Sequence, residues 1–304
     1  MAFERTEWVW TERVWTMRIR NRKEMVLGFA VIVAIWGIVN FAVAFGAEGA
    51  ENVAETAETM ADPIPLKVTE PVDLLRNADA WYPYLKGREP GEDPAKVFVF
   101  EDGTLHVSGE EMGCVTTREA YRDYRLTLEF RWGDRTVAPR VENARDSGLL
   151  IHSVGRDGAF GGCWKYSIEC NIIEGGLGDF IVVGDGSETY AVTADCTLEE
   201  VAGCRAWRAN GGEPWTIYAG RINWFARDPQ WKDVKDFRGK DDLDRAHGEW
   251  NQLEVVAKED RIEIFVNGTL VNRAYNVKPT GGQIQLQSEG AEIFFRNMKV
   301  TPLP

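Results

Sequence analysis

The sequence has little histidine, few cysteines and no excess of positive charge. It holds three histidines and five cysteines in 304 residues, and no Cys-x-x-Cys pair of the kind that structural zinc sites use. Residues 1–24 carry six basic and four acidic side chains, which leaves 29 of the 35 basic and 44 of the 48 acidic residues for the rest. Such an acidic body repels phosphate backbones and anionic lipid, which argues against a nucleic-acid partner.

Long helical periodicity is also absent, apart from a weak pattern at 198–201. Short alternations of apolar and polar residues between turn residues predict strands instead, most clearly at 125–132. Asp102-Gly103 and Asn267-Gly268 are expected hairpin turns. Many short strands indicate an all-β sandwich or jelly roll. The other predicted strands are 96–100, 104–108, 148–152, 180–183, 249–257, 260–266, 269–273, 283–287 and 292–300.

An apolar run at 26–46 follows a basic cluster, which is the arrangement of an export signal. Ala42-Val43-Ala44 offers a cleavage pattern, and about 21 residues is also long enough for an uncleaved membrane anchor. We expect an exported protein, periplasmic or at the cell surface, that meets the membrane only through this segment. The expected regions are a basic cytoplasmic leader at 1–25, a signal or anchor helix at 26–47, an acidic flexible linker at 48–71 and one β-sandwich domain at 72–304.

Outside the cytoplasm cysteines can oxidise. Cys196 and Cys204 bracket a short loop and are the predicted disulfide. Cys163 with Cys170, or Cys163 with Cys114, is a second pair that the sequence allows. The odd number of cysteines leaves at least one free thiol.

Polar chemistry is concentrated in a β-rich run at 164–176. Alternation puts Glu169 and Asn171 on one strand face and Glu174 on the other, and a β-bulge between Asn171 and Glu174 would return Glu174 to the first face. The resulting Glu-x-Asn-x-x-Glu pattern resembles the Glu-x-Asp-x-x-Glu motif of laminarinase-like β-jelly-roll glycosidases, whose outer glutamates are nucleophile and general acid. Here Asn171 stands at the central aspartate position. Two ordinary solvent-facing glutamates are the alternative interpretation.

Six phrases occur in the order found in one family: 121–126, 146–150, the Glu169 run, 248–251, 266–268, and 282–287 continued by 295–298. Together they resemble the 3-keto-disaccharide hydrolase domain, formerly a domain of unknown function, over essentially all of 72–303. The resemblance implies a concanavalin A-like lectin/glucanase sandwich that cleaves glycosides already oxidised at the sugar C3 position.

A ketone at C3 acidifies the hydrogen on C2, so a base can remove it and expel the C1 leaving group by elimination. Hydration of the enone then completes a net hydrolysis. Such a site needs a base, a donor or cation for the enolate oxygen, and an acid for the leaving group. Glu169 and Glu174 are the predicted base and acid, because neighbouring carboxylates push their pKa values apart. Asn171 is predicted to donate to the enolate or to a sugar hydroxyl.

Several other residues are candidates for the site. His152, where many relatives carry arginine, is a third catalytic candidate as base or metal ligand, with a satisfied strand-end histidine as the alternative. Glu129 and Arg131 are predicted sugar contacts, or else a cross-strand charge pair. Aromatic residues in the segment 185–245, which we expect to be irregular, form a sugar-binding lid or pack as an ordinary loop. The remaining predicted contacts are Gln287, Glu289, Trp215 and Trp224.

The sequence identifies no cofactor with certainty, and a divalent cation is possible because the fold class often carries one. The acidic run 240–244 lacks the glycine and closing glutamate of an EF-hand and is expected to be a solvated turn. The expected ligand is a carbohydrate, and two other functions stay open: a non-catalytic lectin-like binding module and a surface scaffold domain. Close carboxylates favour the enzyme, whereas Glu174 on the face opposite Glu169 favours the binding module.

Overall fold

The computed structural model describes residues 7–11, 14–18 and 61–304. The chain divides into two units, Met1–Thr56 and Ala57–Pro304. In the first unit, β1 (Glu7–Thr11) and β2 (Val14–Arg18) form an antiparallel hairpin. The predicted signal or anchor helix at 26–47 lies outside the described residues. Within the described ranges, no helix has the length and apolar character needed to cross a membrane.

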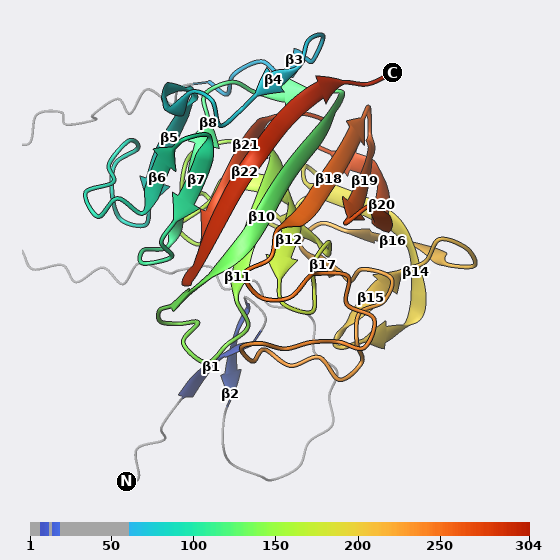
Figure 1. Cartoon of the computed structure of the whole chain (residues 1–304). Coiled ribbons are helices and arrows are strands. Elements are labelled where there is room, and N and C mark those ends of the chain that lie inside the picture. The colour runs from blue at the N-terminus through green and yellow to red at the C-terminus, as the bar shows by residue number, and fades with distance from the viewer. Residues whose placement is uncertain (1–6, 12–13, 19–60) are drawn as a thin grey trace, which may run out of the picture. The chain divides into compact units, whose positions relative to one another are not determined.

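Two antiparallel sheets packed face to face make up most of the second unit (Figure 1). The smaller sheet has seven strands in the order β17-β13-β12-β11-β21-β8-β5. It brings together segments that are far apart in the chain, because β21 pairs with both β8 and β11. Its strands are β5 (Trp81–Leu85), β8 (Gly113–Thr117), β11 (Asp146–Val154), β12 (Tyr166–Ile173), β13 (Phe180–Val183), β17 (Gly220–Ile222) and β21 (Gln283–Ser288).

The larger sheet has 11 strands, with the main order β15-β14-β20-β19-β18-β10-β22-β7-β6 and with β16 on β14 and β4 on β22. A parallel pair, β3 (Leu66–Lys67) with β9 (Tyr121–Arg122), and one 3-10 turn, η1 (Ala78–Ala80), complete the described elements. The larger sheet comprises β4 (Val72–Asp73), β6 (Phe98–Glu101), β7 (Thr104–Val107), β10 (Tyr124–Thr136), β14 (Ala191–Val201), β15 (Cys204–Trp207), β16 (Glu213–Ile217), β18 (Asn251–Lys258), β19 (Arg261–Val266), β20 (Thr269–Lys278) and β22 (Ala291–Pro302).

Strand alternation fills the space between the sheets with apolar side chains. Leu126 and Leu128 of β10 belong to the same buried cluster as Ile168 and Ile172 of β12, and each is at most 1% exposed. Burying one such side chain stabilises the fold by about 1.5–3 kcal/mol. The all-β sandwich predicted from the sequence is confirmed.

The predicted hairpins at Asp102-Gly103 and Asn267-Gly268 are confirmed as β6–β7 and β19–β20. The segment 185–245, expected to be irregular, instead contains the four strands β14 to β17, and the weak helical pattern at 198–201 is the end of β14. The expectation was wrong for 191–222 because β14 contains two alanines, one aspartate and two glutamates, residue types that are depleted in strands, so its strand signal is weak. Its pairing with β15, β16 and β20, which the local sequence does not encode, stabilises it.

The predicted disulfide between Cys196 and Cys204 is wrong. Cys196 is a free thiol buried in the described part of the chain, so it forms no bond with Cys204. The β14–β15 hairpin pairs Cys204 with Val201, directly after the turn, while Cys196 lies opposite Trp207 at the far end of β15. The register of the hairpin therefore separates the two sulfur atoms.

Candidate functional site

Polar side chains gather on the face of the smaller sheet that points away from the core. On β12, Ile168, Cys170 and Ile172 join the main apolar cluster, so the alternate residues Glu169 and Asn171 project from the opposite face. This confirms the side of the strand predicted for the two polar residues. Both are 0% exposed, an unusual state for a carboxylate and an amide that do not face the core.

Gly148 brings β12 and β21 side chains together above this face. It lies opposite Asn171 in the β11–β12 register. A Cβ atom on Gly148 would lie 2.5 Å from Gln287 Oε1 and 2.6 Å from Glu169 Oε1, so both oxygens sit over the same glycine. A glycine inside a strand commonly marks such a close approach. The structure therefore brings three of the predicted site residues, Glu169, Asn171 and Gln287, into one place.

The two amides in this group are buried and unsatisfied. None of the four amide nitrogen and oxygen atoms of Asn171 and Gln287 has a hydrogen-bond partner among the described residues. A buried polar group without a partner costs about 1–3 kcal/mol. Two amides beside a carboxylate offer both donors and acceptors, which is what the hydroxyl groups of a sugar require.

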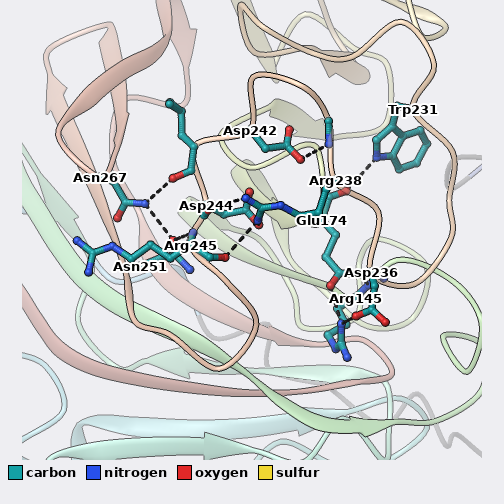
Figure 2. Close-up of polar contacts among 12 residues, drawn as sticks. Arg145, Glu174, Trp231, Asp236, Arg238, Asp242, Asp244, Arg245, Asn251 and Asn267 are labelled. Atoms are coloured by element: carbon teal, nitrogen blue, oxygen red, sulfur yellow. Dashed lines mark hydrogen bonds and ion pairs between the residues drawn. The ribbon is translucent and has the colours of Figure 1, made fainter.

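The bulge predicted between Asn171 and Glu174 is wrong. The β11–β12 register runs without a shift from Ile168 to Ile173, where β12 ends. Glu174 instead forms an ion pair in which its Oε1 accepts from Arg145 Nη1 at 2.6 Å. Its Oε2 accepts from the backbone N–H groups of Arg145 and Asp236. Figure 2 shows Glu174 and Asp236 both directed at Arg145. Every oxygen of this carboxylate is engaged in holding loops together, so it is not paired with Glu169.

Replacing Glu174 is therefore expected to reduce stability. Among the described residues, Glu174→Gln leaves the guanidinium of Arg145, whose side chain is 4% exposed, with only the exposed Asp236 as its ionic partner. Removing one partner of a buried ion pair costs about 3 kcal/mol, and the free energy of unfolding in urea should fall by that amount. Asp236→Asn is the matched control, because Asp236 is 68% exposed and its loss should cost less than about 1 kcal/mol. Equal losses in both variants would contradict this role for Glu174.

His152 lies in the core and not beside Glu169. Its ring packs edge-on against Tyr124 of β10, with ring centroids 6.0 Å apart, and its Nδ1–H donates to the Pro279 carbonyl at 2.8 Å. A register shift after Ile151 and the positive φ of His152, 52°, reverse the strand alternation at this point. The prediction of a catalytic or metal-binding His152 is thus corrected to a core histidine, and the alternative of a satisfied histidine holds for Nδ1 only, because the buried Nε2 has no hydrogen-bond partner among the described residues.

Burial lowers the pKa of His152 to about 4. The unfolded chain, with a histidine pKa of about 6.5, binds this proton first as the pH falls. The stability present above pH 6.5 is therefore lost as the pH falls toward 4, by about 3 kcal/mol. His152→Asn, in which asparagine tolerates the positive φ, should remove this part of the pH dependence of urea unfolding between pH 7 and pH 4. His247→Asn, at an exposed histidine, should keep it, and an unchanged profile in His152→Asn would refute the assignment.

The other predicted sugar contacts lie elsewhere. Glu129 and Arg131 are on β10 and Trp215 is on β16, all in the larger sheet. Glu129 Oε2 accepts from Arg296 Nε at 2.6 Å, which is the predicted alternative of a cross-strand charge pair. Trp224 is 2% exposed within the apolar core, so it is not part of a sugar-binding lid. Glu129, Arg131 and Trp215 are separated from Glu169 because their strands belong to the other sheet. The sequence pattern does not reveal which sheet a strand joins.

Sequence reasoning missed an ionic group at the edge of the site. Arg140 is buried and forms ion pairs with Asp146 at the start of β11, with Asp233 at 2.9 Å and with Glu289 at 3.6 Å. Asp146 stands two residues before Gly148, on the same face of β11. Asp146-Ser147-Gly148 did occur among the phrases that indicated the family, but only the strand pairing shows what its residues contact. Glu289, a predicted contact, lies in this group.

Metal binding finds no support in the described ranges. There, no group of three or more histidine, cysteine, aspartate or glutamate side chains is placed to hold a metal ion. The acidic run 240–244 is partly buried: burial raises the pKa of Asp244 to about 6, and Arg238 Nη1 lies 2.8 Å from its carboxylate (Figure 2). The run therefore anchors a loop, and the prediction of a solvated turn was wrong for Asp244.

The fold and the polar sheet face together define an all-β sandwich domain with buried polar side chains on the outer face of its smaller sheet. Residues 74–301 match the 3-keto-alpha-glucoside-1,2-lyase-like domain, and the chain belongs to that family, which confirms the resemblance of the six phrases. A comparison with curated protein sequences gives no match.

Solved structures of similar fold share little sequence with this chain. A candidate glycosyl hydrolase from Parabacteroides distasonis is 16% identical, with a TM-score of 0.43 over 77% of this chain and 100% of its own. The carbohydrate-binding module CBM66 from Bacillus subtilis is 14% identical, with a TM-score of 0.35 over 78% of this chain and 99% of its own. The Bacillus licheniformis β-glucanase is 10% identical, with a TM-score of 0.37 over 82% of this chain and 100% of its own.

Proposed function

We propose that this protein cleaves glycosides oxidised at C3, with Glu169 as the base that removes the C2 proton. The observation that supports this most is the position of the Glu169 carboxylate over Gly148, beside Gln287 and Asn171. The buried, unsatisfied amides of these two residues suit a sugar ring, on which hydroxyl and carbonyl oxygens alternate. Membership of the 3-keto-alpha-glucoside-1,2-lyase-like family favours the oxidised substrate.

The proposed reaction is an elimination. Glu169 takes the proton from C2, and the electron pair forms an enolate with the C3 carbonyl. The enolate then collapses to a C1–C2 double bond while the C1–O bond breaks. The proton from C2 returns to the departing oxygen, directly or through solvent, so the products are an enone and a free alcohol and Glu169 is ionised again. Addition of water to the enone gives the hydrolysis product.

One carboxylate is sufficient for this chemistry at the centre of the site. The C3 ketone supplies the activation that a second carboxylate supplies in ordinary glycosidases, because it makes the C2 hydrogen acidic. The amide N–H groups of Asn171 or Gln287 can then donate to the enolate oxygen as negative charge develops on it. Glu174, the acid predicted from the sequence, has no part in this proposal because its oxygens hold Arg145 and the Asp236 backbone.

A carbohydrate-binding module without turnover is the second candidate. The observation that favours it is the location of Glu174, which is tied to Arg145 and leaves no partner carboxylate from the same motif beside Glu169. A binding module would use the same two amides for sugar hydroxyls and would need no base.

Turnover decides between the two. The full chain is incubated with a 3-keto-glucoside and with its unoxidised parent, while release of the alcohol and appearance of the enone are followed. We expect turnover of the oxidised substrate only. Saturable binding of both sugars without any release would reject the enzyme and support the binding module. Cleavage of the unoxidised parent at a similar rate would reject the elimination.

We also propose export of the domain, on the basis of the basic cluster and apolar run before residue 47. Fractionation of cells that express the full chain tests this. Recovery of the protein in the cytoplasmic fraction alone would contradict the proposal.

A further inference from the structure

Two buried carboxyl groups lie beside the amide of Gln287. Glu289 follows the end of β21 and stands two residues after Gln287. Asp146 begins β11, the neighbouring strand, two residues before Gly148. The Glu289 and Asp146 side chains are 3% and 1% exposed. The sheet therefore carries a buried pair of carboxyl groups about 7 Å along its strands from the amide that the proposed function places at the sugar.

One arginine holds this pair together. Arg140 Nη2 makes a short contact with Asp146 Oδ2, and the same nitrogen lies 3.6 Å from Glu289 Oε1. The other nitrogen, Nη1, donates to the two oxygens of Asp233 at 2.9 and 3.1 Å. The stem of Arg140 packs on Gly290, where a Cβ atom would lie 2.9 Å from Arg140 Cγ. A single guanidinium nitrogen thus fixes the two buried carboxyl groups as close neighbours.

The Asp146–Glu289 pair is suited to hold one proton. Burial and like charge both disfavour a second negative charge at such a place. Asp146 makes the short contact with Arg140, as a carboxylate does, whereas 3.6 Å from Arg140 to Glu289 is longer than a hydrogen bond. Glu289 is therefore the member that carries the proton. Arg140 remains near enough to stabilise the negative charge of Glu289 once that proton is given away.

The neighbouring amide indicates where the proton goes. Gln287 is 0% exposed, and neither its Oε1 nor its Nε2 has a hydrogen-bond partner among the described residues. Through Leu150, Glu169 is in register with Gln285, two residues before Gln287, whereas Glu289 stands two residues after it. A sugar ring bound to the Gln287 amide is thus flanked by Glu169 on one side and by Glu289 on the other. An elimination requires a base and an acid in this arrangement.

We propose that Glu289 is a catalytic residue, the general acid that protonates the departing oxygen. This inference rests on the proposed function. Glu169 takes the C2 proton, the C1–O bond breaks, and the carboxylic acid of Glu289 gives its proton to the oxygen, which leaves as a neutral alcohol. Glu289 is then a carboxylate and Glu169 a neutral acid. Solvent removes one proton from Glu169 and returns one to Glu289, so the net change is one proton lost from C2 and one gained by the alcohol.

The acidity of the leaving group tests this role. The full chain is assayed with methyl 3-keto-glucoside, whose alkoxide is a poor leaving group, and with 4-nitrophenyl 3-keto-glucoside, whose phenolate departs without a proton. Glu289→Gln should lower kcat/KM for the methyl substrate by roughly 10²- to 10³-fold and leave the nitrophenyl substrate within about threefold of wild type. Glu289→Asp keeps a carboxylic acid, so its loss on the methyl substrate should be only about tenfold.

Glu111→Gln is the matched control. Glu111 lies at the same end of β21, where its carbonyl accepts from Ser288 Oγ at 2.6 Å, and its carboxylate pairs with Arg88 at 2.8 Å. The variant undergoes the same chemical change as Glu289→Gln and should alter neither value. Equal losses on both substrates in Glu289→Gln, or unchanged activity on the methyl substrate, would overturn the proposal. If Glu289→Gln does not fold, Glu289→Asp decides by the same split between the substrates.

Infrared spectroscopy separates a failure of this inference from a failure of the proposed function. If the wild type turns over neither substrate, the proposed function fails, and the proton on Glu289 is then tested by itself. The measurement is the carbonyl band of a protonated carboxylic acid at pH 7. A band that is present in the wild type and missing from Glu289→Gln would support the proton on Glu289. No band in the wild type, or an equal band in both proteins, would overturn it.

Discussion

Glu169→Gln is expected to lower kcat for a 3-keto-glucoside by about 10³-fold while the protein stays folded. The amide has the shape of the carboxylate but cannot accept the C2 proton, and it keeps the capacity to hydrogen-bond a sugar. Affinity for the substrate should therefore change much less than turnover. Rapid-quench kinetics with saturating substrate separate the two quantities.

Glu129→Gln is the matched control for this variant. Glu129 undergoes the same chemical change, but it lies on the larger sheet in an ion pair with Arg296, so turnover should be unchanged. A Glu169→Gln protein that retains activity within tenfold of wild type would show that Glu169 is not the base. Loss of the native circular dichroism spectrum in Glu169→Gln would instead indicate a structural role for this carboxylate.

Gly148→Ala is expected to reduce kcat/KM by about 100-fold. A methyl group there would lie 2.5 Å from Gln287 Oε1 and 2.6 Å from Glu169 Oε1, distances that real Cβ atoms do not show. Both side chains must move, and a displacement of about 1 Å at the reacting groups can cost about 10²-fold in rate. Because the atoms displaced are the ends of flexible side chains, the melting temperature should change little.

The larger sheet supplies a control of the same geometry. A Cβ on Gly133 would lie 2.2 Å from Glu292 Oε2 and 2.5 Å from its Cγ, so the whole glutamate side chain would have to move. Gly133→Ala should therefore displace a glutamate without affecting turnover. If Gly148→Ala is as active as Gly133→Ala, the Glu169 and Gln287 side chains are not needed in their present positions, and the proposed site is wrong.

The local sequence pattern was sufficient to predict the fold class and to predict which side chains share a face of β12. Alternation along β12 predicted that Glu169 and Asn171 share a side, because side-chain direction in a regular strand depends only on parity. The Asn-Gly and Asp-Gly turns likewise predicted two hairpins from four residues. These features depend on neighbours in the sequence, so the sequence alone determines them.

A β-bulge was the feature that sequence reasoning assigned to the wrong strand. We predicted one between Asn171 and Glu174, whereas the shift lies in β11, after Ile151. Two predicted positions were therefore wrong. Glu174 does not lie beside Glu169, and the His152 ring lies in the core. A bulge depends on the pairing of two strands, and a single sequence shows only one strand at a time.

The sequence by itself determined that this chain folds as a β-sandwich of the 3-keto-alpha-glucoside-1,2-lyase-like family and that Glu169 projects from its strand with Asn171. Only the tertiary structure decided that Gln287 joins them, that Glu129, Arg131 and Trp215 lie on the other sheet, and that Glu174 binds Arg145. The physical reason is that strand parity is local, whereas strand neighbours are chosen by burial across the whole sandwich. Residues more than 100 positions apart, such as Glu169 and Gln287, meet only through that choice.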